Sequence, residues 1–312
     1  GGENWFCDFI AAAFQPIDIQ SNYLYPENGK IKAAYVEPEY KEALKYLNKL
    51  CTEGLLSPSS FTSDGAQTRQ TIQNPSGVQV GCFTSMAPTY LINATDRAEG
   101  YDILAPLTQD NGTGYAVYGA SIPTNSFFIT KNCQYPEAAF RLGDIMMSEE
   151  MSIWNRFGKK GTDWVEPEEG DHGMFESMGY KAKIKPILAW GSPQNSHWQQ
   201  GAPAYRGYEL ACATVDSGSN IYETRIAEHL QSYLDKKPKE YITKIIYTED
   251  EINAINEIQQ NITSYRKDSV ARFIIGDWDI ESGWEDYLKE MKAIGIDEML
   301  DIVQNAYDRC NK

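Results

Sequence analysis

The sequence predicts an α/β protein of about two domains with a mostly helical C-terminal region. Its length of 312 residues compares with roughly 150 residues for an average domain. In the first half, short apolar runs that suit strands alternate with segments of helical spacing, which is typical of α/β folds. In the last third, helical spacings follow one another without a strand pattern between them.

The N-terminal elements are expected to be a helix, a hairpin and a second helix. Residues 4–14 carry apolar side chains at a helical spacing. In residues 21–36 the turn sequence PENGK separates two short extended runs. The second helix begins near Pro38, which suits a first helical turn, and ends at Gly54. Residues 56–76 are polar and are expected to be loop with one short helix.

Three segments of the middle region are expected to be strands, namely 78–83, 101–107 and 121–130. The last of them contains the consecutive apolar residues Phe127 to Ile129, a pattern typical of a buried strand. A short helix is expected over residues 87–94.

Helices are expected to dominate the rest of the chain. One begins at Pro136, and a second covers 149–157 and ends at Gly158. Residues 159–204 are expected to be irregular, because Gly, Pro, Trp and Asn are frequent there. The first helix is expected to turn its apolar side chains inward: Ala139, Phe140, Leu142, Ile145 and Met146. Four later helices have spacings that begin at Ile226, Ile252, Trp284 and Leu300.

Composition and charge exclude several function classes. The formal net charge of −16 is unfavourable for binding a polyanion, so neither nucleic acid nor an anionic membrane surface is expected as a partner. The 42% of hydrophobic residues supplies a core and excludes intrinsic disorder. The six cysteines form no CxxC pair and the three histidines form no HExxH motif, so no metal site or cofactor is expected.

The N-terminus is expected to be the inside of a domain. It lacks the basic region of a signal peptide, and no apolar run in the chain reaches the length of a membrane span. The chain is therefore expected to be a fragment of a longer protein.

Several segments, in their order along the chain, resemble the family-1 extracellular solute-binding proteins of ABC importers. The resemblance is to the lipoprotein subgroup of Gram-positive bacteria, and the order of the segments makes it specific. They are EPEYKEALKYLNKLCTEGLLSP (37–58), GVQVGCF (77–83), YDILAPLTQDNGTG (101–114), SFFITKNCQYPEAAFRLGDIMMSEE (126–150), WNRFGKKGTDW (154–164) and RFIIGDWDIESGWEDYLKEMKAIGIDEMLDIVQNAYDR (272–309).

The resemblance implies a partial type II periplasmic-binding-protein-like fold of two lobes. Residues 1–122 would belong to lobe II and residues 123–190 to lobe I. Residues 191–312 would return to lobe II and add the helical C-terminal region, and the segments after about 180 resemble a C-terminal domain of unknown function. Segment 121–130 would be one of the hinge crossings. The N-terminal part of such a protein would be missing.

The same resemblance implies a function without catalysis. The protein would be the substrate-binding component of an ABC importer, and it would capture a carbohydrate, expected to be an oligosaccharide, outside the cell. Its partners would be the sugar and the permease subunits. The full-length protein would be an extracellular lipoprotein, held to the membrane by a lipid anchor that this chain lacks.

Candidate ligand-binding residues are those that suit sugars, since aromatic faces stack on sugar rings and amides bond hydroxyls. Residues 189–205 concentrate such groups, and the alternative is that their tryptophans pin a long loop to the core. Ser85 and Met86 follow an expected strand end, where open α/β sheets bind ligands. Trp154 is expected to serve packing. The full set of candidates is Asn4, Trp5, Ser85, Trp164, Trp190, Gln194, Asn195, Trp198 and Tyr205.

Two other functions stay open. A glycan-active enzyme could use two carboxylates of the acidic loop, such as Glu166 and Glu169, as acid and base, although such a loop is more often a solvated surface. A non-binding fragment could serve packing or docking. The acidic residues between Asp277 and Asp286 could hold calcium, but helix N-terminal charges explain them better.

Overall fold

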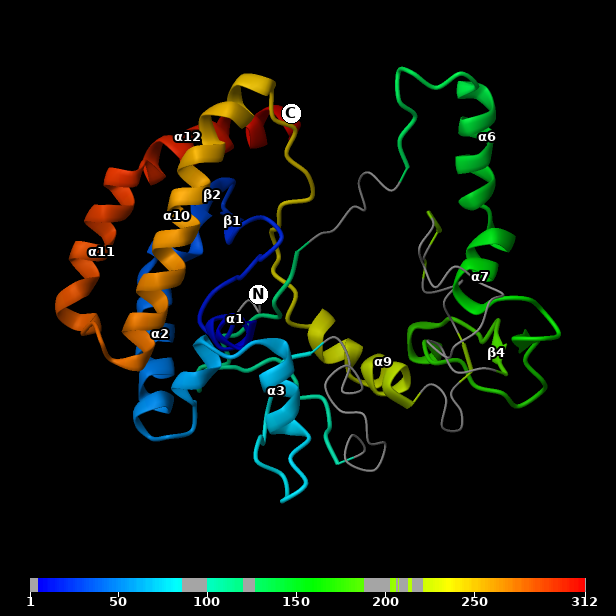
Figure 1. Cartoon of the computed structure of the whole chain (residues 1–312), viewed down its shortest axis with the longest axis horizontal. Coiled ribbons are helices and arrows are strands. Elements are labelled where there is room, and N and C mark those ends of the chain that lie inside the picture. Colours follow the sequence, from blue (N-terminus) through cyan, green and yellow to red (C-terminus); the bar gives the residue numbers. More distant parts are fainter. Residues whose placement is uncertain are drawn as a thin grey trace. The chain divides into compact units, whose positions relative to one another are not determined.

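The computed structural model describes residues 5–85, 100–119, 127–187, 203–205, 207, 213–214 and 221–311. The chain divides into two compact units, which are taken separately below (Figure 1). Unit 1 comprises residues 1–122 and 232–312, and unit 2 comprises residues 123–231. The assignment of residues 1–122, 123–190 and 191–312 to two lobes stays a prediction.

Unit 1 begins with the expected helix and hairpin. Helix α1 covers Trp5–Ala11, and the antiparallel strands β1 (Leu24–Glu27) and β2 (Lys30–Ala33) pair with Glu27 opposite Lys30. Between the strands, Asn28 and Gly29 have φ of 51° and 77°. Two left-handed residues in sequence are what a tight hairpin turn requires, and Asn-Gly is the pair that adopts them most easily.

Helix α2 (Pro38–Thr52) confirms the helix expected from Pro38 to Gly54. It follows a 3-10 turn, η1 (Ala34–Val36). The polar segment after it contains a second 3-10 turn, η2 (Pro58–Phe61), and the short helix α3 (Gly65–Ile72). Asp64 and Gln67 form a reciprocal capping box that begins α3, since each side chain accepts a backbone N–H of the other.

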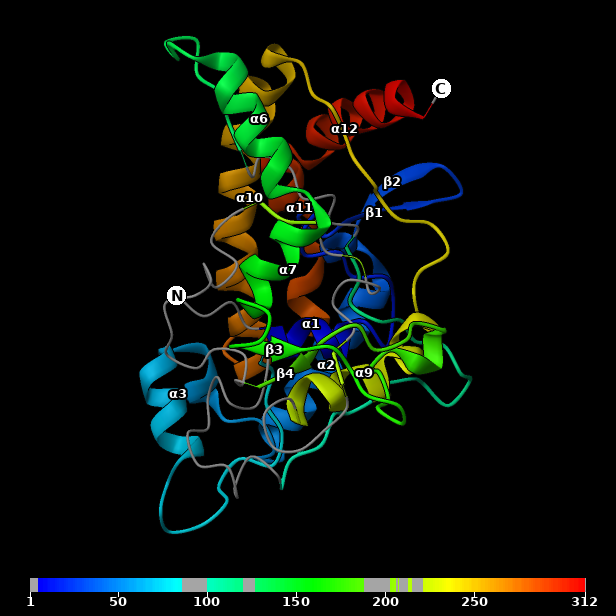
Figure 2. The same ribbon diagram turned by 90° about the vertical axis from the view of Figure 1, so that its right-hand side faces the viewer.

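The C-terminal helices confirm the helical spacings. They are α10 (Glu249–Ile275), α11 (Ile280–Ile294) and α12 (Ile296–Cys310). α10 packs against α2, α11 and α12, and α12 crosses the β1–β2 hairpin, as Figures 1 and 2 show. Gly295, with φ of 112°, ends α11 and allows the chain to turn directly into α12.

The core of unit 1 joins both ends of the chain. Tyr287 of α11 is fully buried and donates its hydroxyl to the Tyr35 carbonyl, 3.1 Å away. Gln304 of α12 accepts the Ile31 N–H at 2.7 Å and donates to the Gly29 carbonyl at 3.0 Å, which fixes the hairpin on the helix.

A buried arginine lies in this core. Arg266 of α10 is 8% exposed, and its guanidinium lies 3.7 Å from the centre of the Tyr23 ring and 5.7 Å from that of Tyr35. The Tyr23 hydroxyl donates to Asp8 of α1 at 3.1 Å. The aromatic faces of the two tyrosines thus compensate part of the cost of burying this charge.

The described residues of unit 2 form helices, a small sheet and a small core. The first two helices are α6 (Pro136–Met146) and α7 (Glu149–Phe157), and the strands β3 (Trp164–Val165) and β4 (Lys185–Pro186) are antiparallel. A 3-10 turn, η3, covers Glu176–Met178, and α9 (Ile221–Leu234) leads back to unit 1. Its core cluster consists of Phe157, Met174, Ile184, Ala213 and Ala227.

Two of the expected strands are wrong. Residues 78–83 and 101–107 are described by the structure and form no strand. The two segments meet through side chains instead, because the Tyr101 hydroxyl donates to the Val80 carbonyl and the Phe83 and Tyr101 rings lie 5.0 Å apart. An apolar run becomes a strand only where a second strand pairs with it, and these runs have no such partner in the described part of the chain.

The expected strand 121–130 is also not seen where it can be examined. Residues 127–130 belong to no helix or strand and pair with no described strand, and 121–126 lie outside the described residues. The short helix expected over 87–94 lies outside them as well. The fold is therefore mostly helical, with four short strands in the described ranges, and the α/β prediction holds only in part.

The expected inward side of α6 is wrong too. Phe140, Leu142 and Ile145 are 66%, 49% and 56% exposed, and no residue of this helix is buried. The spacing of apolar residues identified the helix, but the unit contains too little described structure to cover it.

No helix in the described part of the chain is both long enough and apolar enough to cross a membrane.

Candidate functional site

A tight turn in unit 2, residues 158–164, carries the site. It follows α7 and contains the sequence GKKGTDW. The Thr162 and Asp163 amides donate to the Lys159 carbonyl at 3.1 and 2.8 Å, and the Gly161 amide donates to the Trp164 carbonyl at 2.7 Å. Gly161 has φ of 82°, in the left-handed region where glycine is favoured. These bonds close the turn and set the direction of Trp164.

Asp163 locks this turn to the end of α7. Its side chain is 3% exposed, and its carboxylate accepts the Lys159 amide at 2.6 Å. A β-carbon on Gly158 would collide with the same carboxylate, and Gly158 also has φ of 86°. Glycine is therefore required at 158 both for backbone conformation and for space.

Trp164 is fixed on three sides. Its indole N–H donates to the Gly158 carbonyl at 3.0 Å, its backbone pairs with Pro186 of β4, and its ring packs against the core of unit 2. The Lys160 ammonium lies 5.7 Å from the centre of the ring. Trp164 therefore lines one wall of the site in a single orientation.

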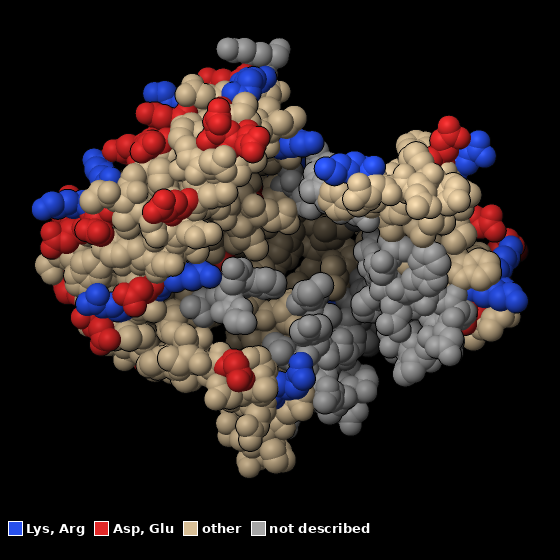
Figure 3. All heavy atoms as spheres, turned by 45° about the horizontal axis from the view of Figure 1, so that its top comes forward, with Lys and Arg blue, Asp and Glu red and all other residues tan. Residues whose placement is uncertain are grey.

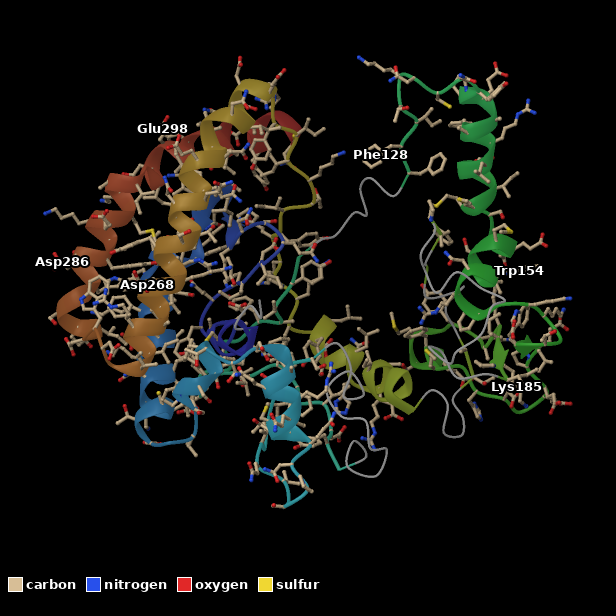
Figure 4. The ribbon with its side chains drawn as sticks, viewed as in Figure 1. Phe128, Trp154, Lys185, Asp268, Asp286 and Glu298 are labelled. Atoms are coloured by element: carbon tan, nitrogen blue, oxygen red, sulfur yellow. The ribbon has the colours of Figure 1, made fainter. Side chains whose placement is uncertain are left out.

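A pocket of about 590 Å³ lies between α7 and this turn. Trp154 of α7, labelled in Figure 4, lines it and is 39% exposed. The sequence interpretation assigned Trp154 to packing, but the structure makes it a wall of the pocket. The pocket is lined by Glu149, Glu150, Ile153, Trp154, Gly158, Lys159, Lys160 and Trp164.

Ion pairs organise the charged groups around the pocket. Lys160 bonds Glu166 and holds the pKa of that carboxyl below its usual range. Lys183 bonds Glu149 at 3.0 Å. Glu149 and Glu150 lie in the first turn of α7, where the helix dipole favours negative charge. The pocket thus combines two indole walls with carboxylates and ammonium groups, which is an arrangement that stacks on a sugar ring and bonds its hydroxyls.

Tyr205 reaches the same helix but not the same pocket. Its backbone amide donates to the Ser152 hydroxyl at 2.9 Å, and Tyr205 is 53% exposed. Ser152 and Trp154 are two residues apart, which is roughly 200° around a helix. Tyr205 therefore joins α7 on a different side from Trp154.

Most of the other candidate residues cannot be placed. Asn4, Met86, Trp190, Gln194, Asn195, Trp198 and the neighbouring His197 and Gln199 lie outside the described residues, and so does the side chain of Trp5. Ser85 lies in unit 1 and is half-buried. Their role in binding stays a prediction.

Two carboxylates of the acidic loop of unit 2, Asp171 and Glu166, do not have the raised pKa of a glycosidase general acid. Lys185 bonds Asp171 at 3.0 Å, and a backbone N–H from Glu168 together with this ammonium lowers the pKa of Asp171. The pKa of Glu166 is also lowered. A general acid needs a raised pKa, so these carboxylates are poorly suited to that role.

The described residues contain no group of three or more His, Cys, Asp or Glu that could hold a metal ion. In the acidic segment considered for calcium, Asp279 instead caps α11 by accepting the Ser282 amide at 2.9 Å. Glu281 bonds both Lys41 and Lys45, each at 2.7 Å. The interpretation as helix N-terminal charges fits these contacts.

No family model matches the chain, but one curated protein does. It is the fructooligosaccharide ABC transporter substrate-binding protein FusA of Streptococcus pneumoniae, which is 22% identical over 99% of this chain and 56% of its own length. The chain thus spans little more than half the length of this relative, and it is a distant homologue of ABC transporter solute-binding proteins over nearly its whole length.

Solved structures of solute-binding proteins share the fold. FusA in complex with kestose is similar with a TM-score of 0.69 and 19% identity, over 97% of this chain and 61% of that chain. An HMO-binding, ABC-transporter-associated solute-binding protein from Bifidobacterium longum infantis has a TM-score of 0.71 and 15% identity. This similarity covers 97% of this chain and 61% of that chain. The alginate-binding protein AlgQ2 has a TM-score of 0.62 at 16% identity, over 98% of this chain and 63% of that chain.

Proposed function

We propose that this distant homologue of solute-binding proteins is part of the substrate-binding component of an ABC importer that captures an oligosaccharide outside the cell. The observation that carries the proposal is the pocket of unit 2, in which Trp154 and Trp164 form walls beside carboxylates. The relatives are named for binding sugars rather than for catalysis, which supports a function without turnover.

An uncharged oligosaccharide fits this chain better than an anionic one. The net charge of −16 repels a polyanion at long range, and Glu149 and Glu150 repel it at the pocket. Two of the nearby lysines are paired with carboxylates, Lys160 with Glu166 and Lys183 with Glu149. Fructooligosaccharides such as kestose are therefore better first candidates than alginate.

The proposal extends to the partners of the whole protein. The proposal includes transfer of the sugar to permease subunits and attachment of the full-length protein to the cell surface as a lipoprotein. It draws its support from the similarity to the importer proteins above.

The first test measures sugar binding by isothermal titration calorimetry. The 312-residue chain is titrated with kestose, with neutral human-milk oligosaccharides and with alginate oligomers. We expect a dissociation constant on the order of 1–100 µM for at least one neutral sugar. The change Trp154→Ala should weaken it about tenfold, because a stacking contact is worth roughly 1.5 kcal/mol.

The matched control is Leu55→Ala, since Leu55 is 72% exposed in unit 1 and lies outside the pocket. Its affinity should equal that of the parent chain. Equal affinities for parent chain and Trp154→Ala would show that the sugar binds elsewhere. The same titrations are made with the product of the complete gene. If both proteins are folded and neither gives heat with any neutral sugar, the proposed oligosaccharide binding is wrong.

A further inference from the structure

The pocket between α7 and the turn 158–164 is lined by two acidic and two basic side chains, and they differ in whether they are paired. Glu149 and Lys160 each form an ion pair with a residue outside the pocket. Among the residues that the structure describes, the Glu150 carboxylate and the Lys159 ammonium form neither an ion pair nor a side-chain hydrogen bond. One acidic and one basic group of the pocket are therefore left to bond a ligand.

Ion pairs are common elsewhere on this molecule. On the face shown in Figure 3, many Lys and Arg side chains lie beside Asp or Glu. In unit 2, for example, Lys185 bonds Asp171 at 3.0 Å. A charged group that lines a pocket without such a partner keeps its full capacity for hydrogen bonds, and bonds to a charged group are stronger than those between neutral groups.

The two unpaired groups lie at opposite ends of the pocket. Glu150 is in the first turn of α7, and Trp154 is one turn further along the same face, because residues four apart lie above one another on a helix. Lys159 follows the end of α7 at Phe157. The helix from Glu150 to Phe157 rises by about 10 Å. The Trp154 indole therefore lies between the carboxylate and the ammonium along the pocket wall.

We infer that Glu150 and Lys159 bind the two ends of one uncharged oligosaccharide that is at least two sugar residues long and lies across Trp154. This inference rests on the proposed function. A carboxylate accepts hydrogen bonds and an ammonium donates them, and sugar hydroxyls can do both. A single sugar ring stacked on Trp154 is too short to reach both ends.

The signs of the two groups select against a charged ligand. An anionic group on the sugar is attracted by Lys159 and repelled by Glu150, and a cationic group experiences the reverse. An uncharged chain can satisfy both. The pocket volume of about 590 Å³ lies within the usual range for ligand sites, roughly 300–1,000 Å³, so a short oligosaccharide fits it.

The experiment is calorimetric titration of kestose into the parent chain, Glu150→Gln, Lys159→Gln and the double variant. Each single change should weaken binding about tenfold, because it removes a hydrogen bond to a charged group. The double variant should bind roughly 100-fold more weakly, since effects at distant positions add as free energies. A single variant that binds like the parent would overturn the inference, and so would a double variant no weaker than the weaker single.

Two matched controls test whether net charge alone explains the losses. Glu137 lies in the first turn of α6, as Glu150 does in α7, so Glu137→Gln also removes a charge at a helix N-terminus. Lys181 is an exposed lysine of unit 2. Neither residue lines the pocket, so Glu137→Gln and Lys181→Gln should bind kestose within about twofold of the parent. Losses equal to those of the pocket variants would contradict a direct contact.

The length and charge of the ligand provide a second readout. Fructose, a single sugar, contacts one end only and should bind at least about 100-fold more weakly than kestose. Equal affinities would show that one sugar ring fills the site. Alginate oligomers that bind more tightly than kestose, lose binding in Lys159→Gln and gain it in Glu150→Gln would show selection of an anion, and the inference would be wrong.

The outcomes distinguish this inference from the proposed function. If Trp154→Ala weakens kestose binding while both charge variants bind like the parent, the proposed function stands and the inference fails. If the parent binds a neutral human-milk oligosaccharide instead of kestose, the same variants are titrated with that sugar and the same losses are expected. If the folded chain and the product of the complete gene bind no neutral sugar, both fail.

Discussion

At the scale of single residues, Gly158 and Gly161 allow the conformational cost of replacing a glycine to be distinguished from the steric cost. Both have positive φ, of 86° and 82°, so a side chain at either position forces a left-handed backbone. Only at Gly158 would a β-carbon also collide, and it would meet the buried Asp163 carboxylate. The two positions therefore share the conformational cost and differ in the steric one.

We expect Gly161→Ala to destabilise unit 2 by about 1 kcal/mol and Gly158→Ala by about 3 kcal/mol, because the second change also displaces a buried carboxylate. Urea unfolding followed by tryptophan fluorescence measures both. Gly158→Ala should also weaken sugar binding, since the turn orients Trp164. Equal destabilisation by the two changes would show that Asp163 does not lock the turn.

At the scale of elements, the first turn of α10 depends on one carboxylate. Glu251 accepts the Thr248 amide at 2.7 Å in a capping box, and it bonds Arg309 of α12 at 2.7 Å. The Arg309 guanidinium, with the Thr248 amide, lowers the pKa of Glu251 from 4.5 to about 2. A lowered pKa stabilises the fold above the unfolded-state value and loses that effect as pH falls.

The change Glu251→Gln should preserve the cap, because glutamine can accept the same amide, but remove the charge that pairs with Arg309. We expect the variant to melt below the parent chain at pH 7. The difference should shrink as pH falls from about 4.5 to about 2 and vanish below that. Calorimetry at a series of pH values measures it. A difference that is independent of pH would assign the effect to packing rather than to charge.

Local patterns predicted helices well and strands poorly. The helices from Pro38, from Pro136 and over Trp284–Ile294 follow from spacings within a single segment. Strands depend on partners far along the chain, so residues 78–83 had the right composition without the right neighbours.

The parts of the site that depend on local sequence were predictable, and those that depend on packing were not. Trp164 and its turn follow from the Gly-x-x-Gly-x-x-Trp sequence, which closes locally. The exposure of Trp154 depends on how α7 packs, and no spacing within the helix reveals it. The one available signal was its position ten residues before Trp164, on the other flank of the same turn.

At the scale of the whole molecule, the two units differ greatly in core size. Unit 1 buries a large cluster that includes Tyr287, Phe273 and Met291, all at 0% exposure. Among the residues that the structure describes, the core cluster of unit 2 contains five buried residues. Since buried apolar area supplies most of the stability of a domain, we expect unit 2 to be the weaker one in this chain.

We expect the 312-residue chain to unfold in two steps, with unit 2 first. Hydrogen exchange measured by mass spectrometry in increasing denaturant should release the amides of residues 149–157 before those of 262–274. The local opening free energies should differ by several kcal/mol, on the order of 3 kcal/mol. A sugar that binds in the pocket should raise only the first transition. A single transition for both segments would contradict this order.

The division of unit 1 into two separate parts of the chain governs the order in which the protein forms during synthesis. Helix α2 buries Leu44 and Leu47 in a cluster that contains Phe273 of α10. More than two hundred residues separate these partners along the chain. At 5–20 residues per second, the ribosome takes roughly 10–45 s to make the residues between Leu47 and Phe273. All of unit 2 is made within that interval, so its chain is complete before the core of unit 1 can close.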